Sequence, residues 1–224
     1  METIINVDDV SFSYGAQTER ALSHISLSVN KGDFIGIIGP SGAGKSTLAA
    51  CLSGAVPHHY TGTFFGSVMV DGHDTCEVSL TDVSQIVGSV LQDIDTQMVA
   101  SVVEDEMLFG LENFGVPHDQ IEQRLSETLK TVGISDLRDR EIATLSGGQK
   151  QKVAIAAILA MRPRVLVLDE PTAALDPASS TLVFETLREA NRALGITIVV
   201  VEQKVALLSE YCNRVLVLNH GEIA

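Results

Sequence analysis

Short hydrophobic runs alternate along this chain with segments of helical periodicity. The stretches "DFIGIIG", "RVLVLDE" and "GITIVVVEQK" are rich in β-branched and aliphatic residues, as expected of strands covered on both faces. Helices are predicted at 45–52, 149–161, 179–194 and 205–211, and the last strand at 214–218. Strands that alternate with helices predict a largely parallel sheet covered by helices, so the expected fold class is α/β.

Two parts of the pattern depart from this alternation. Near the N-terminus, strands are predicted at 4–10 and 22–29, with a turn around Gly15, and again at "SVMVDG" and "QIVGSVLQ". The second part is the stretch at about 93–140. Apolar or small residues recur there at helical spacing, namely Ile121, Leu125, Thr128, Leu129 and Val132. We therefore expect one domain over 1–224, with a core from 1–92 and 141–224 and a helical part inserted at about 93–140.

Composition and charge exclude several classes of function. The 224 residues include 29 acidic and only 15 basic side chains, a net charge of −14, so no general grip on nucleic acid is expected. Cys51, Cys76 and Cys212 are far apart and indicate reduced thiols in a cytosolic protein. The first residues do not resemble a signal peptide, and no apolar run reaches the length of a membrane span. Any role at a membrane is therefore expected to need a partner.

A glycine-rich loop follows the strand "DFIGIIG". The residues are Gly39, Pro40, Ser41, Gly42, Ala43, Gly44, Lys45, Ser46 and Thr47. Glycines let backbone N–H groups approach phosphate oxygens, and the start of the next helix adds partial positive charge. Lys45 would place its charge on the outer phosphates, and the Ser46 hydroxyl would bind Mg²⁺. The strand–loop–helix context makes a nucleoside triphosphate site a better interpretation than a chance turn.

Two carboxylates end the strand "RVLVLDE". Asp169 can hold Mg²⁺ directly or through water, and Glu170 can orient and polarise an attacking water molecule. A solvated acidic pair is the alternative. This alternative is less favoured, because the phosphate loop and these two acids both follow strands, and the carboxyl ends of parallel strands lie at one edge of the sheet.

The stretch "LSGGQKQ", residues 145–151, lies shortly before "VLVLDEP". It is similar to the signature sequence of ABC transporter ATPases, and the resemblance extends over essentially the whole chain. The resemblance implies the phosphate-loop ABC ATPase fold, with a mostly parallel core, an N-terminal antiparallel β-subdomain and an inserted α-helical subdomain. It also implies ATP and Mg²⁺ as cofactors.

Further matches to the family imply roles for single residues. Tyr14 resembles the aromatic that stacks on adenine, Gln92 the Q-loop glutamine, and Asp176 the D-loop aspartate. Mg²⁺ is expected at Ser46, Gln92 and Asp169, and catalysis at Glu170, Lys45 and Gln203. ATP is expected between two such domains arranged head to tail. The second domain would contact it through signature residues that are here Ser146, Gly147, Gly148 and Gln149, at the start of a helix.

The segment "SVLQDIDTQMVASVVEDEMLFGLENFGVP" resembles the ATPases of energy-coupling factor transporters, which import vitamins and metal ions. The resemblance implies a second ABC ATPase domain, a transmembrane coupling subunit and a substrate-binding membrane subunit as partners. The chain would then work at the cytoplasmic face of the cell membrane. The segment "SGAVPHHYTGTFFGSVMVDGHDT" resembles fused family members, so the chain is expected to be one domain taken from a longer ATPase or the first half of a tandem protein.

An acidic group flanks the Q-loop and the start of the helical insertion. Its members are Asp93, Asp95, Glu104, Asp105 and Glu106. About half of such a group is expected to be a solvated face. The resemblance implies that the rest, with Gln97, docks basic residues of the membrane subunit. Our hypothesis is that Asp93 or Asp95 contacts an arginine of that subunit.

Gln203, after the strand 196–201, departs from the family pattern, which has histidine there to bond the γ-phosphate. An amide can donate one hydrogen bond, but it cannot carry a charge or shuttle a proton. A lost charge-assisted bond costs about 1.5–3 kcal/mol. We predict that the site on this phosphate loop is the slower of two unequal sites.

Three other functions are alternatives to transport. A regulatory ABC domain that hydrolyses ATP poorly is consistent with Gln203. A chromosome-maintenance ATPase would carry long coiled-coil insertions, which this sequence lacks. An ABC protein acting on ribosomes would favour basic linkers, whereas this chain is acidic. We therefore expect no nucleic-acid partner.

Overall fold

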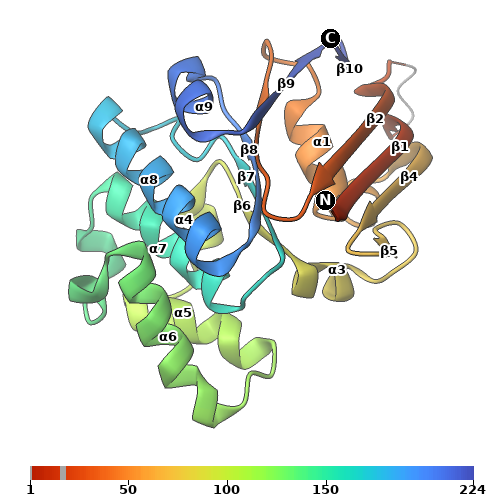
Figure 1. Cartoon of the computed structure of the whole chain (residues 1–224). Coiled ribbons are helices and arrows are strands. Elements are labelled where there is room, and N and C mark those ends of the chain that lie inside the picture. The colour runs from red at the N-terminus through yellow and green to blue at the C-terminus, as the bar shows by residue number, and fades with distance from the viewer. Residues whose placement is uncertain (1, 16–18) are drawn as a thin grey trace.

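Two β-sheets form the framework of residues 2–15 and 19–224, which the computed structural model describes (Figure 1). The strands are β1 (Thr3–Tyr14), β2 (Leu22–Asn30), β3 (Phe34–Ile38), β4 (Gly62–Val70), β5 (His73–Asp74), β6 (Val87–Val90), β7 (Val165–Asp169), β8 (Thr197–Val201), β9 (Arg214–Asn219) and β10 (Glu222–Ile223). One sheet is antiparallel, with the order β2-β1-β4-β5. The other has the order β10-β9-β3-β8-β7-β6 and is parallel except at β10.

Helices cover both faces of the parallel sheet. They are α1 (Lys45–Leu52), α2 (Ala55–His58), α3 (Leu80–Ile86), α4 (Ile94–Gln97), α5 (Val103–Asn113), α6 (His118–Val132), α7 (Gly147–Ala160), α8 (Pro177–Leu194) and α9 (Val205–Tyr211), with 3-10 turns η1 (Ser135–Leu137) and η2 (Ile142–Thr144). Helix α1 lies between the two sheets, whereas α7, α8 and α9 cover the other face (Figure 1). Helices α5 and α6 pack on α7, away from the antiparallel sheet. This arrangement confirms the predicted fold class.

Strand β8 shows why the hydrophobic run was continuous. Ile198 and Val200 face the core that α7 and α8 complete, while Val199 and Val201 face the core shared with α1 and the antiparallel sheet. All four side chains are at most 1% exposed. A strand buried on both faces cannot alternate apolar with polar residues, because neither face reaches water.

Local signals placed most of the element ends. Helices α1 and α9 have the predicted bounds, and α8 begins two residues earlier than predicted, at Pro177. The strand predicted over "QIVGSVLQ" was partly wrong, because its first two residues complete α3. Ser79 begins that helix by accepting a hydrogen bond from the Asp82 N–H at 3.2 Å. The two-residue strand β10 was not predicted, since so short a segment carries no periodicity.

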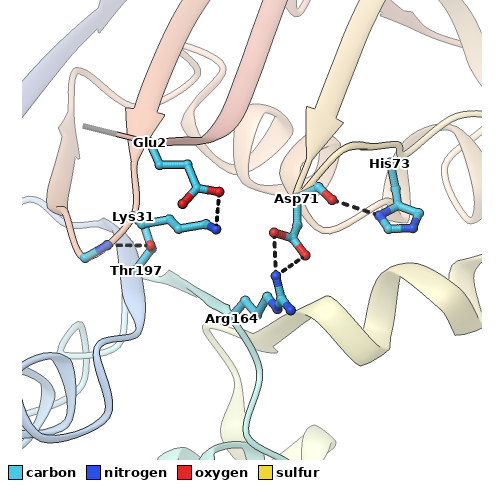
Figure 2. Close-up of polar contacts among 7 residues, drawn as sticks. Glu2, Lys31, Asp71, His73, Arg164 and Thr197 are labelled. Carbon is cyan, nitrogen blue, oxygen red and sulfur yellow. Dashed lines mark hydrogen bonds and ion pairs between the residues drawn. The ribbon is translucent and has the colours of Figure 1, made fainter.

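An ion pair and a hydrogen bond tie the two sheets together at the edge away from the glycine-rich loop (Figure 2). Arg164, just before β7, pairs with Asp71 in the β4–β5 turn at 2.7 Å. The Gly32 N–H, in the turn between β2 and β3, donates to the Thr197 hydroxyl of β8 at 3.0 Å. Within the antiparallel sheet, Lys31 pairs with Glu2 across the ends of β2 and β1. The first two contacts hold the antiparallel sheet against the parallel one.

Candidate nucleotide site

The carboxyl ends of four parallel strands bring the predicted site residues together. The glycine-rich loop follows β3, Gln92 follows β6, Asp169 ends β7 with Glu170 directly after it, and Gln203 follows β8. Strand register aligns these ends, because Val201 of β8 pairs with both Ile37 of β3 and Asp169 of β7. A cavity of about 490 Å³ lies between them, and its lining includes Tyr14, Lys45, Ser46, Gln92, Glu170 and Gln203.

The loop between β3 and α1 needs its glycines for two physical reasons. A side chain at Gly39 would place its Cβ 2.1 Å from the Leu218 carbonyl oxygen, so a strand of the same sheet excludes it. Gly44 has φ of 98°, a left-handed conformation that favours glycine, at the N-cap of α1. Lys45 is only 6% exposed, and its ammonium donates to the carbonyls of Gly39 and Pro40 at 3.0 Å each. The backbone of the loop therefore folds around the Lys45 ammonium group.

Tyr14 ends β1 on the same cavity. Its hydroxyl lies 3.0 Å from the Thr47 hydroxyl of α1. Its ring meets Phe12 and Tyr60 edge-on, at centroid distances of 4.8 and 6.1 Å. These contacts fix the ring beside the phosphate loop, where one face can stack on a planar base.

Asp169 has the properties of a metal ligand. Its Oδ1 atom is buried and has no hydrogen-bond partner among the described residues. Burial raises the pKa of Asp169, and the Glu170 charge adds to this shift, whereas the Ser46 hydroxyl and the Lys45 ammonium oppose it. A buried carboxylate oxygen without a donor is costly unless a cation occupies that side. The hard oxygen donors of Ser46 and Asp169 therefore fit Mg²⁺.

Glu170 is held from two sides by amide groups. Gln92 donates its Nε2 hydrogen to Glu170 Oε2 at 3.2 Å, and Gln203 donates to Oε1 at 2.7 Å. The Glu170 backbone has φ of 48°, and its N–H donates to the Val201 carbonyl at 2.9 Å. A non-glycine residue in the left-handed region is uncommon. It directs the carboxylate into the cavity, where an acceptor can orient a water molecule.

The signature residues cap α7 and lie outside this cavity. Ser146 Oγ accepts from the Gln149 N–H at 3.3 Å, and Gln149 Oε1 accepts from the Ser146 N–H at 2.9 Å. This capping box leaves the N–H groups of Gly147, which is exposed, and Gly148, which is half-buried, at the helix start. The segment borders a separate cavity of about 210 Å³. The helix start is therefore free to meet an anion from another molecule.

Asp176 begins α8. Its Oδ1 accepts from the N–H groups of Ala178 and Ser179 at 3.0 Å each, and its Oδ2 accepts from the Ser179 hydroxyl. The hydrogen bonds from Ser179 lower the pKa of Asp176. Asp176 therefore serves as a helix N-cap in this chain, a contact that the sequence analysis did not anticipate.

A family model described as "ABC transporter" matches residues 22–173. The chain belongs to this family. The match spans the phosphate loop, the signature and both strand-end carboxylates. As a member, this cassette is the ATP-binding subunit of an ABC transporter and an ATPase.

Similar proteins support the family assignment along the full chain. An ABC transporter ATP-binding protein of Pyrococcus horikoshii is 44% identical over 220 residues, covering 98% of this chain and 78% of the relative. The solved structure of cbiO1 from Clostridium perfringens, part of the ABC transporter complex cbiONQ, has a TM-score of 0.90 at 33% identity, covering 100% of this chain and 88% of cbiO1. The cassette MJ0796, solved as a dimer bound to ADP and Pi, has a TM-score of 0.81 at 26% identity, covering 98% and 96% of the chains.

The acidic residues near the Q-loop of this ABC cassette differ in their surroundings. Asp95 pairs with Lys150 of α7 at 2.7 Å. Gln97 braces the loop, because its Oε1 accepts from the Leu91 N–H at 2.9 Å and its Nε2 donates to the Ser89 carbonyl at 3.0 Å. Glu106 is 8% exposed and accepts from two backbone N–H groups, so it has a structural role. Asp93 is exposed at the N-cap of α4, and its side chain makes no capping bond there.

Three candidate functional residues were not predicted from the sequence, namely Glu202, Thr172 and Lys204. Glu202 is 1% exposed and Thr172 fully buried, and the Thr172 hydroxyl donates to the Glu202 carboxylate. Lys204 reaches the segment after Glu170. The charges of Glu202 and Lys204, directly after a buried strand, were a sequence signal that these residues have a function. Their partners could not be predicted, because they lie 24 to 32 positions away in the chain.

Proposed function

We propose that this cassette powers import of a vitamin or metal ion through membrane subunits, as an ATPase of the energy-coupling factor type. The observation that carries this proposal is the convergence of the phosphate loop, Glu170 and Gln203 on one cavity, with Asp169 beside Ser46 on the adjoining cavity, in a chain similar to cbiO1 of a cbiONQ complex. Among the described residues, no helix has the length and apolar character needed to cross a bilayer. The route for the substrate would then lie in other subunits.

The geometry of the cavity supports the following roles. Gly39 to Thr47 surround the phosphates, and Lys45 moves its ammonium from loop carbonyls to the outer phosphate oxygens. Ser46, Asp169 and Gln92 would hold Mg²⁺, which neutralises charge on the phosphates. Glu170 orients the attacking water and accepts its proton. Tyr14 stacks on the base.

We further propose that ATP binds between this cassette and a second ABC domain. The start of α7 supports this, because the N–H groups of Gly147 and Gly148 take no part in the capping box and lie outside the cavity of their own phosphate loop. The second domain would present its signature to the phosphate loop described here. Gln203 favours an asymmetric pair of ABC domains in which the site on this chain's phosphate loop hydrolyses ATP more slowly than the other site. Alternatively, ATP at this site has mainly a regulatory role.

A groove beside the nucleotide site is the proposed docking place for the transmembrane coupling subunit. A cavity of about 350 Å³ runs from the exposed side chains of Tyr60, Leu80 and Leu91 to Ser46 and Asp169. Asp93 and Asp95 follow Leu91 by two and four residues and line a neighbouring cavity with Gln92 and Glu170. An apolar cavity with an acidic cavity beside it suits a short helix that carries basic side chains.

Purification of the full-length protein from its native host under mild detergent tests the import proposal. We expect a second ABC ATPase domain and at least one polytopic membrane protein to co-purify, and ATP hydrolysis to depend on the intact assembly. Mass spectrometry of the bound small molecule would identify the substrate class. Recovery with DNA-repair or ribosomal proteins in place of membrane subunits would contradict the proposal.

Charge reversal at Asp93 and Asp95 tests the docking site. The double variant Asp93→Lys, Asp95→Lys is expected to reduce recovery of the membrane subunit at least about tenfold, because whichever aspartate contacts a basic side chain becomes a repelling cation, and each reversed charge is worth about 1 kcal/mol. The matched control is Asp119→Lys with Asp139→Lys, two exposed acids of the helical region. Undiminished assembly and transport in the first double variant would rule out this docking site.

A further inference from the structure

Lys204, the residue directly after Gln203, forms hydrogen bonds through its side chain with the segment 172–180. Its ammonium donates to the Thr172 carbonyl at 2.7 Å, the Leu175 carbonyl at 3.1 Å and the Ser180 hydroxyl at 2.7 Å. An ammonium has three N–H donors, so every one of them is used within residues 172–180. This segment begins two residues after Glu170 and contains Asp176.

The backbone around Lys204 is fixed as firmly as its side chain. The Glu202 carboxylate accepts from the N–H groups of Gln203 at 2.8 Å and Lys204 at 3.3 Å, and also from the Thr172 hydroxyl. Glu202 is 1% exposed, and Thr172 and Ser180 are at most 1% exposed. Hydrogen bonds to a buried carboxylate are strong, because water does not compete with them. Gln203 therefore lies between two residues that are both bonded to the segment 172–180.

The same segment is tied to the start of α8. Ser180, which accepts from Lys204, donates its own hydroxyl hydrogen to the Asp176 carbonyl at 2.8 Å. Asp176 caps that helix through its side chain. A movement of Asp176 or of the first turn of α8 must consequently shift at least one acceptor of the Lys204 ammonium.

We propose that Lys204 is a positioning residue that makes the placement of Gln203 against Glu170 depend on the conformation of residues 172–180. The inference rests on the proposed roles of Glu170 and Gln203. It means that residues 172–180, which contain the D-loop residue Asp176, are physically connected to the Gln203 side chain of the same chain. If a second ABC domain contacts Asp176, that contact would then change how Glu170 is held in this site.

A purely structural role for Lys204 explains the contacts less well. Helix α9, which Lys204 precedes, is anchored by buried Leu207 and Leu208, and the Lys204 ammonium contacts none of its residues. No carboxylate in the described part of the chain forms an ion pair with Lys204, so the ammonium depends on oriented carbonyl and hydroxyl oxygens. A half-buried charge held only by oriented dipoles is sensitive to small displacements of those dipoles.

A double-mutant cycle in the purified assembly tests the proposal. Lys204→Met is combined with the native Gln203, with Gln203→His and with Gln203→Ala. Hydrolysis on this chain is followed by vanadate trapping of a radiolabelled photoreactive ATP analogue, with the labelled chains separated on a gel. Binding is measured with the same analogue at low temperature, and thermal unfolding reports stability. Lys130→Met, at an exposed lysine of α6, is the control.

We expect Lys204→Met to reduce trapping about tenfold with glutamine or histidine at 203, and less than about twofold with Gln203→Ala, with unchanged binding of the analogue. Ser180→Ala, a milder change, should show a smaller loss with the same dependence on residue 203. Equal losses in all three backgrounds, or losses that follow stability alone, would overturn the proposal. Trapping that survives Glu170→Gln would instead show that the proposed site roles are wrong.

Discussion

Replacing Glu170 with glutamine is expected to lower ATP hydrolysis at this site by about 10²–10⁴-fold, the usual contribution of a general base. The Glu170 carboxylate is directed into the nucleotide cavity and is held by the amides of Gln92 and Gln203. A neutral amide of the same shape keeps the packing but cannot accept a proton from water. The loss should therefore appear in the rate at saturating ATP.

Binding should persist in the same variant. The phosphate loop and Lys45 are untouched, so the affinity for ATP is expected to change by less than about threefold, within about 0.7 kcal/mol. The measurement is steady-state hydrolysis by the assembly, together with equilibrium binding of a fluorescent ATP analogue. Glu189→Gln, at an exposed position of α8, is the matched control. Full hydrolysis on this chain with Glu170→Gln would remove Glu170 from the proposed mechanism.

Replacing Gln203 with histidine is expected to raise hydrolysis at this site by about ten- to a hundredfold. The change restores a side chain that can carry a charge toward the γ-phosphate, which in a charge-assisted bond is worth about 1.5–3 kcal/mol. In the native chain the Gln203 amide donates to Glu170 Oε1 at 2.7 Å. An imidazole can form the same bond to Glu170 and, when protonated, also stabilise charge on the phosphate.

The pH dependence offers a second readout for this variant. A histidine is charged below its pKa and neutral above it, so the added activity should be largest on the acidic side and decline as pH rises. The native amide does not titrate and should show no such decline. Vanadate trapping on this chain, compared between the two proteins across pH, measures the difference. An unchanged rate with Gln203→His in the full assembly would contradict the prediction of a slow site.

Much of the site was predictable because its chemistry is local. The phosphate loop needs small residues, a lysine and a hydroxyl in consecutive positions, and α1 begins at Lys45 as expected. The signature segment starts α7 through Ser146, whose capping role depends on Gln149 three residues later. In both cases the residues that cooperate are neighbours in the chain, so their spacing carries the information.

The sequence by itself therefore determined the family, the α/β class, most helix and strand positions, and which residues could hold phosphate, metal and water. Only the tertiary structure decided which of these residues contact one another. Asp95 pairs with Lys150 at a separation of 55 positions, Glu170 bonds Gln203 at 33, and Lys204 reaches Thr172 at 32. Such contacts depend on the order and register of the parallel strands. Those are set by burial of the whole sheet, which no single segment of the sequence encodes.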